Sequence, residues 1–124
     1  MSEAGTWPDI EVYIRHTDLA SVKVWLDQLF GLRTESRRGD AVHCQLGESG
    51  MEAVIVENAA EGGYTTVWFT PNLTAWRDDR ACARDAFARF GNEVRCTAGP
   101  WQEGDSLEDG WLSISDRGER TINW

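Results

Sequence analysis

The chain has 124 residues, of which 41% are hydrophobic, and it carries a formal net charge of −9. This length suits one compact domain covering residues 1–124, and no apolar stretch approaches the roughly 20 residues that cross a bilayer. The negative charge disfavours nucleic acid and membrane surfaces as partners, because both are bound through clustered Lys and Arg. The N-terminal stretch MSEAGTWPD lacks the basic and apolar regions of a signal peptide, so we expect a cytoplasmic protein.

The cysteines form an odd set, Cys44, Cys82 and Cys96, with no CxxC spacing. This usage predicts reduced, mostly buried thiols and disfavours both a disulfide framework and a zinc site.

The first predicted strand covers residues 10–16, where apolar and more polar side chains alternate with the period of a half-buried strand. A helix follows, with Thr17 or Asp18 as its N-cap and Gly31 as its C-terminal stop. The apolar positions expected to pack together between this strand and helix are Ile10, Val12, Ile14, Leu19, Val22, Trp25, Leu26 and Leu29.

Three further strands are predicted at about 32–37, 41–46 and 51–57, followed by a connector at 58–63. In the middle one, alternation assigns the side chains to two faces. Val42, Cys44 and Leu46 share one face, and Ala41, His43 and Gln45 share the other.

The pattern then restarts with the apolar strand TTVWFT, whose register has two solutions. Hydrophobicity sends Val67 and Phe69 to the core and Trp68 to the other face, whereas alignment by the following turn reverses them. We prefer the first, because Val and Phe form a better helix-facing pair than two threonines. A second helix is predicted to begin at Asn72 or Thr74 and to end at Gly91, with Trp76, Ala83, Phe87 and Phe90 along one side.

The chain ends with a predicted strand near 93–97, a Gly-rich acidic loop and two short strands at 111–116 and 120–124. The hairpin turn between these strands is assigned to residues 116–119. The loop carries Trp101, and it is either a simple connector or a lid over a ligand.

An internal repeat runs through these elements. The segments VYIRHTDLASVKVWLDQLFG and VWFTPNLTAWRDDRACARDAFARFG both contain an apolar strand, a polar turn and a helix that stops at Phe-Gly. Repetition of this kind predicts two similar modules within one domain, at about 10–57 and 64–124.

Two βαβββ modules in a chain of this length resemble the vicinal oxygen chelate superfamily, which includes glyoxalase I, extradiol dioxygenases and bleomycin-resistance proteins. The resemblance covers residues 10–124 and is carried most specifically by YIRHTDLASVKVWLDQLFG and DGWLSISDRGERTINW. It implies an α+β fold in which the modules form curved mixed sheets, with a concave cavity on one side and the helices outside. Because half-open sheets leave unpaired edges, we also expect a homodimer.

Catalytic members of this superfamily bind a divalent cation through the first, fifth and eighth strands. The corresponding positions here are Glu11, Thr65 or Thr66, and Asn123, of which only Glu11 is a strong ligand. We therefore predict no metal and no cofactor. Two alternatives stay open, a metal site made of His43, Glu11 and Glu52, and an acid/base pair of Glu11 with His43.

Seven tryptophans are an unusual number for this length. Trp25 and Trp76 are assigned to helices that fill the core, and Trp124 to the end of the sheet or a dimer seam. The resemblance implies that the strand face opposite the helices lines the cavity. Alternation places Val54 and Thr121 on this face as well. The predicted ligand-binding residues on this surface are Glu11, Tyr13, Arg15, His43, Gln45, Glu52, Trp68, Trp101, Trp111, Ser113 and Asn123.

Aromatic walls stack on planar ligands and attract cations. We therefore predict a metal-independent small-molecule binding protein, resembling those that sequester an antibiotic or another planar or cationic ligand. One alternative is a glyoxalase- or dioxygenase-type lyase or isomerase with an atypical metal site or none, which requires Glu11, Arg15 and His43 within hydrogen-bonding reach. Another is a structural or regulatory dimer whose cavity is filled by its own side chains. Whether the protein is an enzyme stays open at this point.

Overall fold

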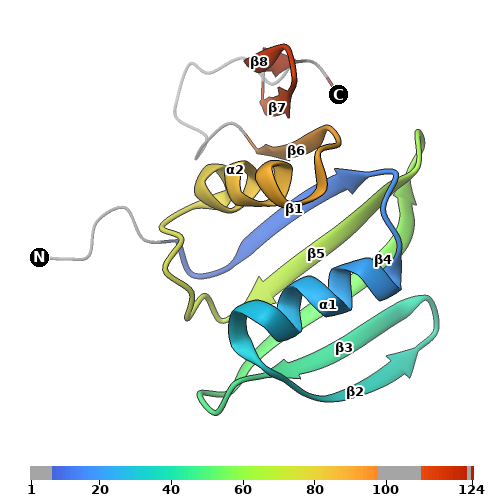
Figure 1. Ribbon diagram of the computed structural model, residues 1–124, viewed down its shortest axis with the longest axis vertical. Helices are drawn as coiled ribbons and strands as arrows, with labels where there is room; N and C mark the ends of the chain where they lie inside the picture. Colours follow the sequence, from blue (N-terminus) through green and yellow to red (C-terminus); the bar gives the residue numbers. More distant parts are fainter. Residues whose placement is uncertain (1–6, 98–109, 123) are drawn as a thin grey trace, which may run out of the picture.

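The computed structural model describes residues 7–97, 110–122 and 124, and it contains one eight-stranded sheet with two helices packed on the same face (Figure 1). Along the chain a strand, a helix and three strands follow one another twice. The elements are β1 (Ile10–Arg15), α1 (Leu19–Phe30), β2 (Leu32–Arg38), β3 (Ala41–Leu46), β4 (Met51–Ala60), β5 (Tyr64–Thr70), α2 (Asp79–Phe90), β6 (Val94–Thr97), β7 (Trp111–Ser115) and β8 (Gly118–Ile122).

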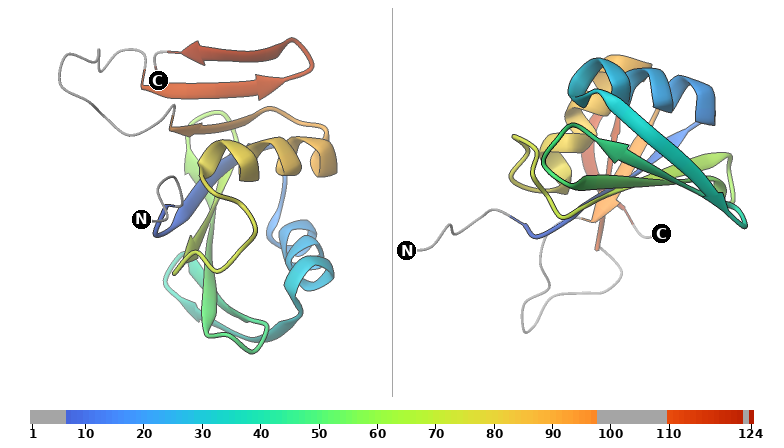
Figure 2. Two further views of the ribbon diagram at one scale, coloured as in Figure 1. Left: turned by 90° about the vertical axis from the view of Figure 1, so that its left-hand side faces the viewer. Right: turned by 90° about the horizontal axis from the view of Figure 1, so that it is seen from below.

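The strands lie in the order β2-β3-β4-β5-β1-β6-β7-β8, and each neighbouring pair is antiparallel. The predicted α+β class is confirmed, but the predicted mixed sheets are wrong. The two halves of the chain share one antiparallel sheet, because β1 lies between β5 and β6 of the second half. Figure 2 shows that this sheet is open and strongly twisted.

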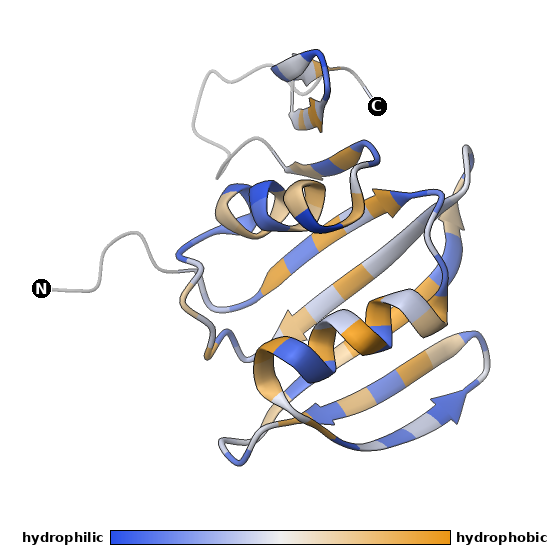
Figure 3. Cartoon of the chain, in the orientation of Figure 1, coloured by the Kyte–Doolittle hydropathy of each residue, from blue (hydrophilic) through white to orange (hydrophobic). Residues whose placement is uncertain are grey.

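The core lies between the helices and one face of the sheet. Its β1 and β5 positions are fully buried, namely Ile10, Val12, Ile14, Val67 and Phe69. This burial confirms the preferred register of β5, and it leaves Trp68 on the opposite face with 38% of its surface exposed. Figure 3 shows the alternation of apolar and polar residues along β1 and β3, whereas the edge strand β2 is largely hydrophilic.

Helix α1 begins and ends where the sequence predicts. The Asp18 side chain accepts a 2.8 Å hydrogen bond from the Ser21 backbone, and Gly31 ends the helix with a φ of 83°. Leu29 is the exception on the predicted apolar stripe, since it is 47% exposed. From the last turn it is Phe30 that packs inward, with its ring centre 6.0 Å from that of Phe69.

Helix α2 begins at Asp79, later than predicted. Its N-cap is Asp78, whose carboxylate accepts a hydrogen bond from the Ala81 backbone. Asn72 and Thr74 instead close a turn, in which Asn72 Oδ1 accepts from the Thr74 backbone N–H at 3.1 Å. The prediction was wrong because Asn and Thr favour both helix caps and local turns.

Trp76 therefore lies on a connecting segment and not on a helix. It is nevertheless a core residue, only 8% exposed, with its ring centre 5.3 Å from that of Phe69 and 5.9 Å from that of Trp25.

The β7–β8 hairpin turns through only two residues, so β8 begins at Gly118, earlier than predicted. Gly118 has a φ of 98°, which a side chain would disfavour. This register pairs Thr121 with Leu112, on the helix-covered side, so the predicted cavity position of Thr121 is wrong. Arg120 takes that face instead, opposite Ser113.

All three cysteines are buried and none forms a disulfide, as the sequence predicts. Neither helix in the described ranges combines the length and the apolar character that crossing a membrane requires.

Candidate functional site

Most of the predicted ligand-binding residues lie on the sheet face opposite α1 and α2, which we call the open face. Strand alternation places nine of them there, and Trp101 and Asn123 lie outside the described residues. The nine are Glu11, Tyr13, Arg15, His43, Gln45, Glu52, Trp68, Trp111 and Ser113. His43 and Glu52 form one group, with Gln45 opposite Glu52 on the neighbouring strand, and Tyr13, Arg15, Trp111 and Ser113 belong to a second. Glu11 and Trp68 belong to neither group.

The first group surrounds His43, whose Nδ1 lies 2.8 Å from Glu52 Oε2. Glu11 is not part of it. In the sheet register His43 faces Val54, Val54 faces Trp68, and Trp68 faces Glu11. Three strand spacings, about 14 Å in total, therefore separate His43 from Glu11.

The predicted acid/base pair of Glu11 with His43 is thus wrong. Glu11 instead accepts a 3.1 Å hydrogen bond from the Thr66 hydroxyl. The alternative metal site fails for the same reason, because Glu11 cannot reach the position of His43 and Glu52. Within residues 7–97 and 110–122, no three His, Cys, Asp or Glu side chains gather to hold a metal ion.

The second group is aromatic and brings together two predicted residues, Tyr13 and Trp111, with ring centres 5.7 Å apart. Trp124 packs against both, at 5.2 Å from Tyr13 and 4.8 Å from Trp111. Tyr64 completes this aromatic cluster at 5.1 Å from Trp124. Trp68 does not join, since its indole N–H donates to Asp9.

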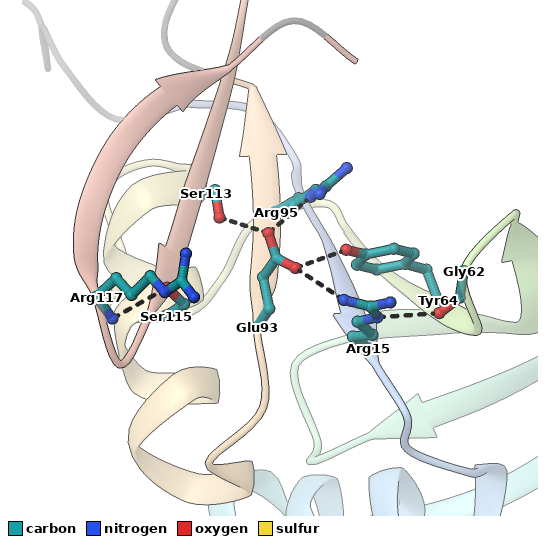
Figure 4. A network of polar contacts seen from close by, with 8 residues as sticks. All are labelled: Arg15, Gly62, Tyr64, Glu93, Arg95, Ser113, Ser115 and Arg117. Carbon is teal, nitrogen blue, oxygen red and sulfur yellow. Dashed lines mark hydrogen bonds and ion pairs between the residues drawn. The ribbon is translucent and has the colours of Figure 1, made fainter.

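A polar network adjoins the aromatic cluster and centres on Glu93 (Figure 4). Its carboxylate accepts hydrogen bonds from the Tyr64 hydroxyl at 2.9 Å, Arg95 Nε at 2.9 Å and the Ser113 hydroxyl at 2.5 Å. Arg15 Nη1 lies 3.5 Å from the same carboxylate. We call these five residues the Glu93 network.

The network determines the charge of its central group. Burial alone would raise the pKa of Glu93, but the hydrogen bonds from Ser113, Arg95 and Tyr64 outweigh burial and lower this pKa to about 2. Glu93 is therefore a permanent anion near neutral pH.

Arg95 belongs to both the polar and the aromatic groups. Its guanidinium carbon lies 4.7 Å from the ring centre of Trp124 and 5.0 Å from that of Tyr64. Cation–π contacts of this kind hold a guanidinium in a defined orientation on the aromatic rings. The cluster and the network thus form one continuous site.

Sequence reasoning missed four members of this site, Tyr64, Glu93, Arg95 and Trp124. Alternation along 93–97 contained the signal for Glu93 and Arg95: because Val94 and Cys96 face the core, these two residues face the other way. The contacts of Trp124 have no such signal, since they depend on the order of β5, β1, β6 and β7 in the sheet.

A hollow of about 500 Å³ opens next to the Glu93 network. It lies where the ends of β1 and α2 meet the β7–β8 turn. Four arginines line it, Arg15, Arg95, Arg117 and Arg120, together with the acidic side chains of Glu93 and Asp116.

One buried carboxylate lies outside this site. Asp79 is 5% exposed, and it accepts hydrogen bonds from the Glu11 backbone N–H at 3.0 Å and the Thr97 hydroxyl at 2.9 Å. Burial is the main reason that the pKa of Asp79 is raised to about 6. One carboxylate oxygen of Asp79 thus binds the backbone of β1 and the other binds a side chain of β6, so Asp79 joins the start of α2 to two strands and has a structural role.

Compared with family models, curated proteins and solved structures, the chain matches none of them. The resemblance to the vicinal oxygen chelate superfamily therefore stays a prediction, and the function has to be argued from the site itself.

Proposed function

We propose that this protein is a metal-independent, non-catalytic binding protein for a planar small molecule, which lies on the open face against the aromatic cluster. The observation that carries the proposal is the position of Arg95 against Trp124 and Tyr64, beside Trp111. The Trp124 ring and the Arg95 guanidinium offer flat surfaces on which a planar ligand stacks, whereas Tyr64 is only 2% exposed and supports the cluster from within. Trp124 is 39% exposed, so part of this surface is available to a ligand.

The ionisation of the site favours binding over catalysis. A general base works best with a pKa near the working pH, whereas the pKa of Glu93 is about 2. Its carboxylate is also saturated by donors from Tyr64, Arg95 and Ser113. The arrangement required by the lyase or isomerase alternative does not form, because Glu11 and His43 lie on different parts of the sheet.

The charge of the site favours the planar alternative over the cationic one. The guanidinium groups of Arg95 and Arg15 lie against rings of the aromatic cluster, and Glu93 is already engaged with both. The Glu11 carboxylate, which lies on the side of Tyr13, accepts the hydrogen bond from Thr66. Glu52, the other predicted acidic residue of the open face besides Glu11, is hydrogen-bonded to His43 elsewhere on the face. Sequestration of such a ligand is the role that the family resemblance implies, and it forms part of the proposal.

The test is a screen of planar aromatic fragments by two-dimensional ¹H–¹⁵N NMR. The indole N–H of each tryptophan gives its own signal, which single Trp→Phe variants assign. We expect binding fragments to shift the signals of Trp111 and Trp124 and to leave those of the core residues Trp25 and Trp76 unchanged. Fragments that bind only near Trp68, or no binding fragment at all, would contradict the proposal.

The homodimer stays a prediction. The strands at the two sheet edges, β2 and β8, carry several charged residues, including Arg37, Arg38 and Glu119, and charged edges oppose strand pairing between chains. Sedimentation velocity at micromolar concentration tests this prediction. A dimer would need an interface away from these edges, or one in which their charges are neutralised. A monomer would contradict the prediction.

A further inference from the structure

We infer that the arginine-lined hollow binds a compact oxyanion, a carboxylate or phosphate group of a small molecule. The inference rests on the proposed function, because this group would belong to the ligand whose planar part lies on the aromatic cluster. Arg95 touches both places, since it lines the hollow and contacts Trp124.

Positive charge is concentrated around this hollow. The whole chain has a net charge of −9 and only 12 Lys and Arg residues, yet four of these 12 line this single hollow. The acidic side chains in the lining are Glu93 and Asp116, so positive charge exceeds negative by two. On an acidic protein, such a local excess of positive charge attracts an anion to this hollow.

The hollow also offers hydrogen-bond donors that are available to a ligand. In the described ranges, the side chains of Arg117 and Arg120 make no hydrogen bond or ion pair, although both are exposed and line the hollow. Arg15 adds a half-exposed guanidinium, with 42% of its side chain accessible. Guanidinium groups bind carboxylates and phosphates in a bidentate manner, which favours oxyanions over chloride.

Contacts within the protein hold Arg15 and the backbone of the hairpin turn in place around the hollow. Glu93 and the carbonyl oxygen of Gly62 hold Arg15, and the backbone N–H of Arg117 donates to the Ser115 hydroxyl, which closes the hairpin turn (Figure 4). A prearranged site loses less conformational entropy when it binds its ligand. A volume of about 500 Å³ also lies within the range typical of small-molecule sites.

Two features work against an anion here, and they set the expected affinity. The C-terminal end of α2, which carries a partial negative charge, borders the hollow at Gly91, and Asp116 lies beside Arg117. We therefore expect an isolated oxyanion to bind with a dissociation constant in roughly the millimolar range, where one or two charge-assisted contacts suffice.

The experiment titrates the protein with citrate and, separately, with inorganic pyrophosphate, at constant ionic strength set with sodium chloride. Binding is followed through backbone NMR shifts. The test variant is Arg117→Gln/Arg120→Gln. The control is Arg37→Gln/Arg38→Gln, which removes the same charge from β2, at the other edge of the sheet.

We expect at least one of the two anions to bind and the test variant to weaken binding about tenfold or more, while the control changes it less than about twofold. Binding of citrate alone identifies a carboxylate site, and binding of pyrophosphate alone a phosphate site. Equal weakening in both double variants would overturn the inference, because it would mean that binding depends only on the net charge of the protein and not on this hollow. Absence of binding of either anion at about 20 mM, well above the expected range, would also overturn it.

The outcomes separate the inference from the proposed function. If planar fragments shift Trp111 and Trp124 while neither anion binds, only the inference fails. If an anion binds at Arg117 and Arg120 while no fragment reaches the tryptophans, the proposed function fails and the anion site remains.

Discussion

The hydroxyl of Tyr64 donates a 2.9 Å hydrogen bond to Glu93, and this contact crosses β1, which separates β5 from β6 in the sheet. Tyr64 comes from the strand that opens the second half of the repeat, and Glu93 immediately precedes β6. With Arg15 on β1 and Ser113 on β7, the Glu93 carboxylate joins four strands at one end of the open face. The same contacts that shape the candidate site therefore stabilise the sheet.

Glu93→Gln is expected to lower the free energy of unfolding at pH 7 by about 1–3 kcal/mol, because it removes a partly buried charge from its donors and leaves Arg15 and Arg95 without their counterion. The folded-state pKa of Glu93 lies below its ordinary value of 4.5, so its contribution is complete above pH 4.5 and is lost as the pH falls toward 2. Urea unfolding of both proteins between pH 2 and 7 should show the difference shrinking toward acid. A difference that stays constant with pH would contradict this role.

The stability contribution of Asp79, tested with Asp79→Asn, should depend on pH in the opposite direction to that of Glu93. The folded-state pKa of Asp79 is raised to about 6 from 3.8, so its contribution to stability is complete below pH 3.8 and declines as the pH rises through 6. Relative to this variant, the wild-type protein should lose up to about 3 kcal/mol between pH 4 and 7. Parallel stability curves for the two proteins would show that the Asp79 carboxylate is not desolvated.

Phe69→Ala tests the core. Phe69 is fully buried against Trp25, Phe30 and Trp76, so the cavity left by truncation should lower the free energy of unfolding by about 3–5 kcal/mol. Leu73→Ala is the control, since Leu73 is 50% exposed and its truncation should cost less than about 1 kcal/mol. Similar losses in the two variants would mean that β5 has another register.

The three thiols should be unreactive in the folded protein. Burial raises the pKa of Cys44 to about 11 and that of Cys96 to about 12, and it raises the pKa of Cys82 as well. Because only the thiolate reacts readily, titration with a disulfide reagent at pH 8 should give almost no signal without denaturant and three thiols in urea. Rapid reaction of one thiol in the folded protein would place that cysteine at the surface.

Much of the fold could be predicted because local patterns determine it. The structure confirms the alternation in β1 and β3 and the terminal glycines Gly31 and Gly91, and it selects Asp18 from the two predicted caps; each of these features depends on neighbours a few residues away. The predicted start of α2 was wrong, because Asn72 and Thr74 form a turn with the same residue types that cap helices.

The candidate site was harder to predict, because it depends on the order of strands and not on local pattern. Alternation placed Tyr13 and Trp111 on the same face, but only the position of β6 between β1 and β7 brings Arg95 to them. Conversely, Glu11 and His43 share that face, yet the strands between them keep them apart. Sharing a face is therefore a necessary condition for sharing a site, but not a sufficient one.

The most direct test of the proposed function is calorimetric titration of the best planar fragment into the wild-type protein, Trp111→Ala and Trp68→Ala. Both tryptophans lie on the open face, but only Trp111 belongs to the aromatic cluster. We predict that Trp111→Ala weakens binding about tenfold or more and lowers stability by less than about 2 kcal/mol, while Trp68→Ala binds normally. A Trp111→Ala protein that keeps its affinity for the fragment would contradict the proposed function. A Trp111→Ala protein that loses its fold would also contradict it, and would favour the alternative in which the open face is filled by the protein's own side chains.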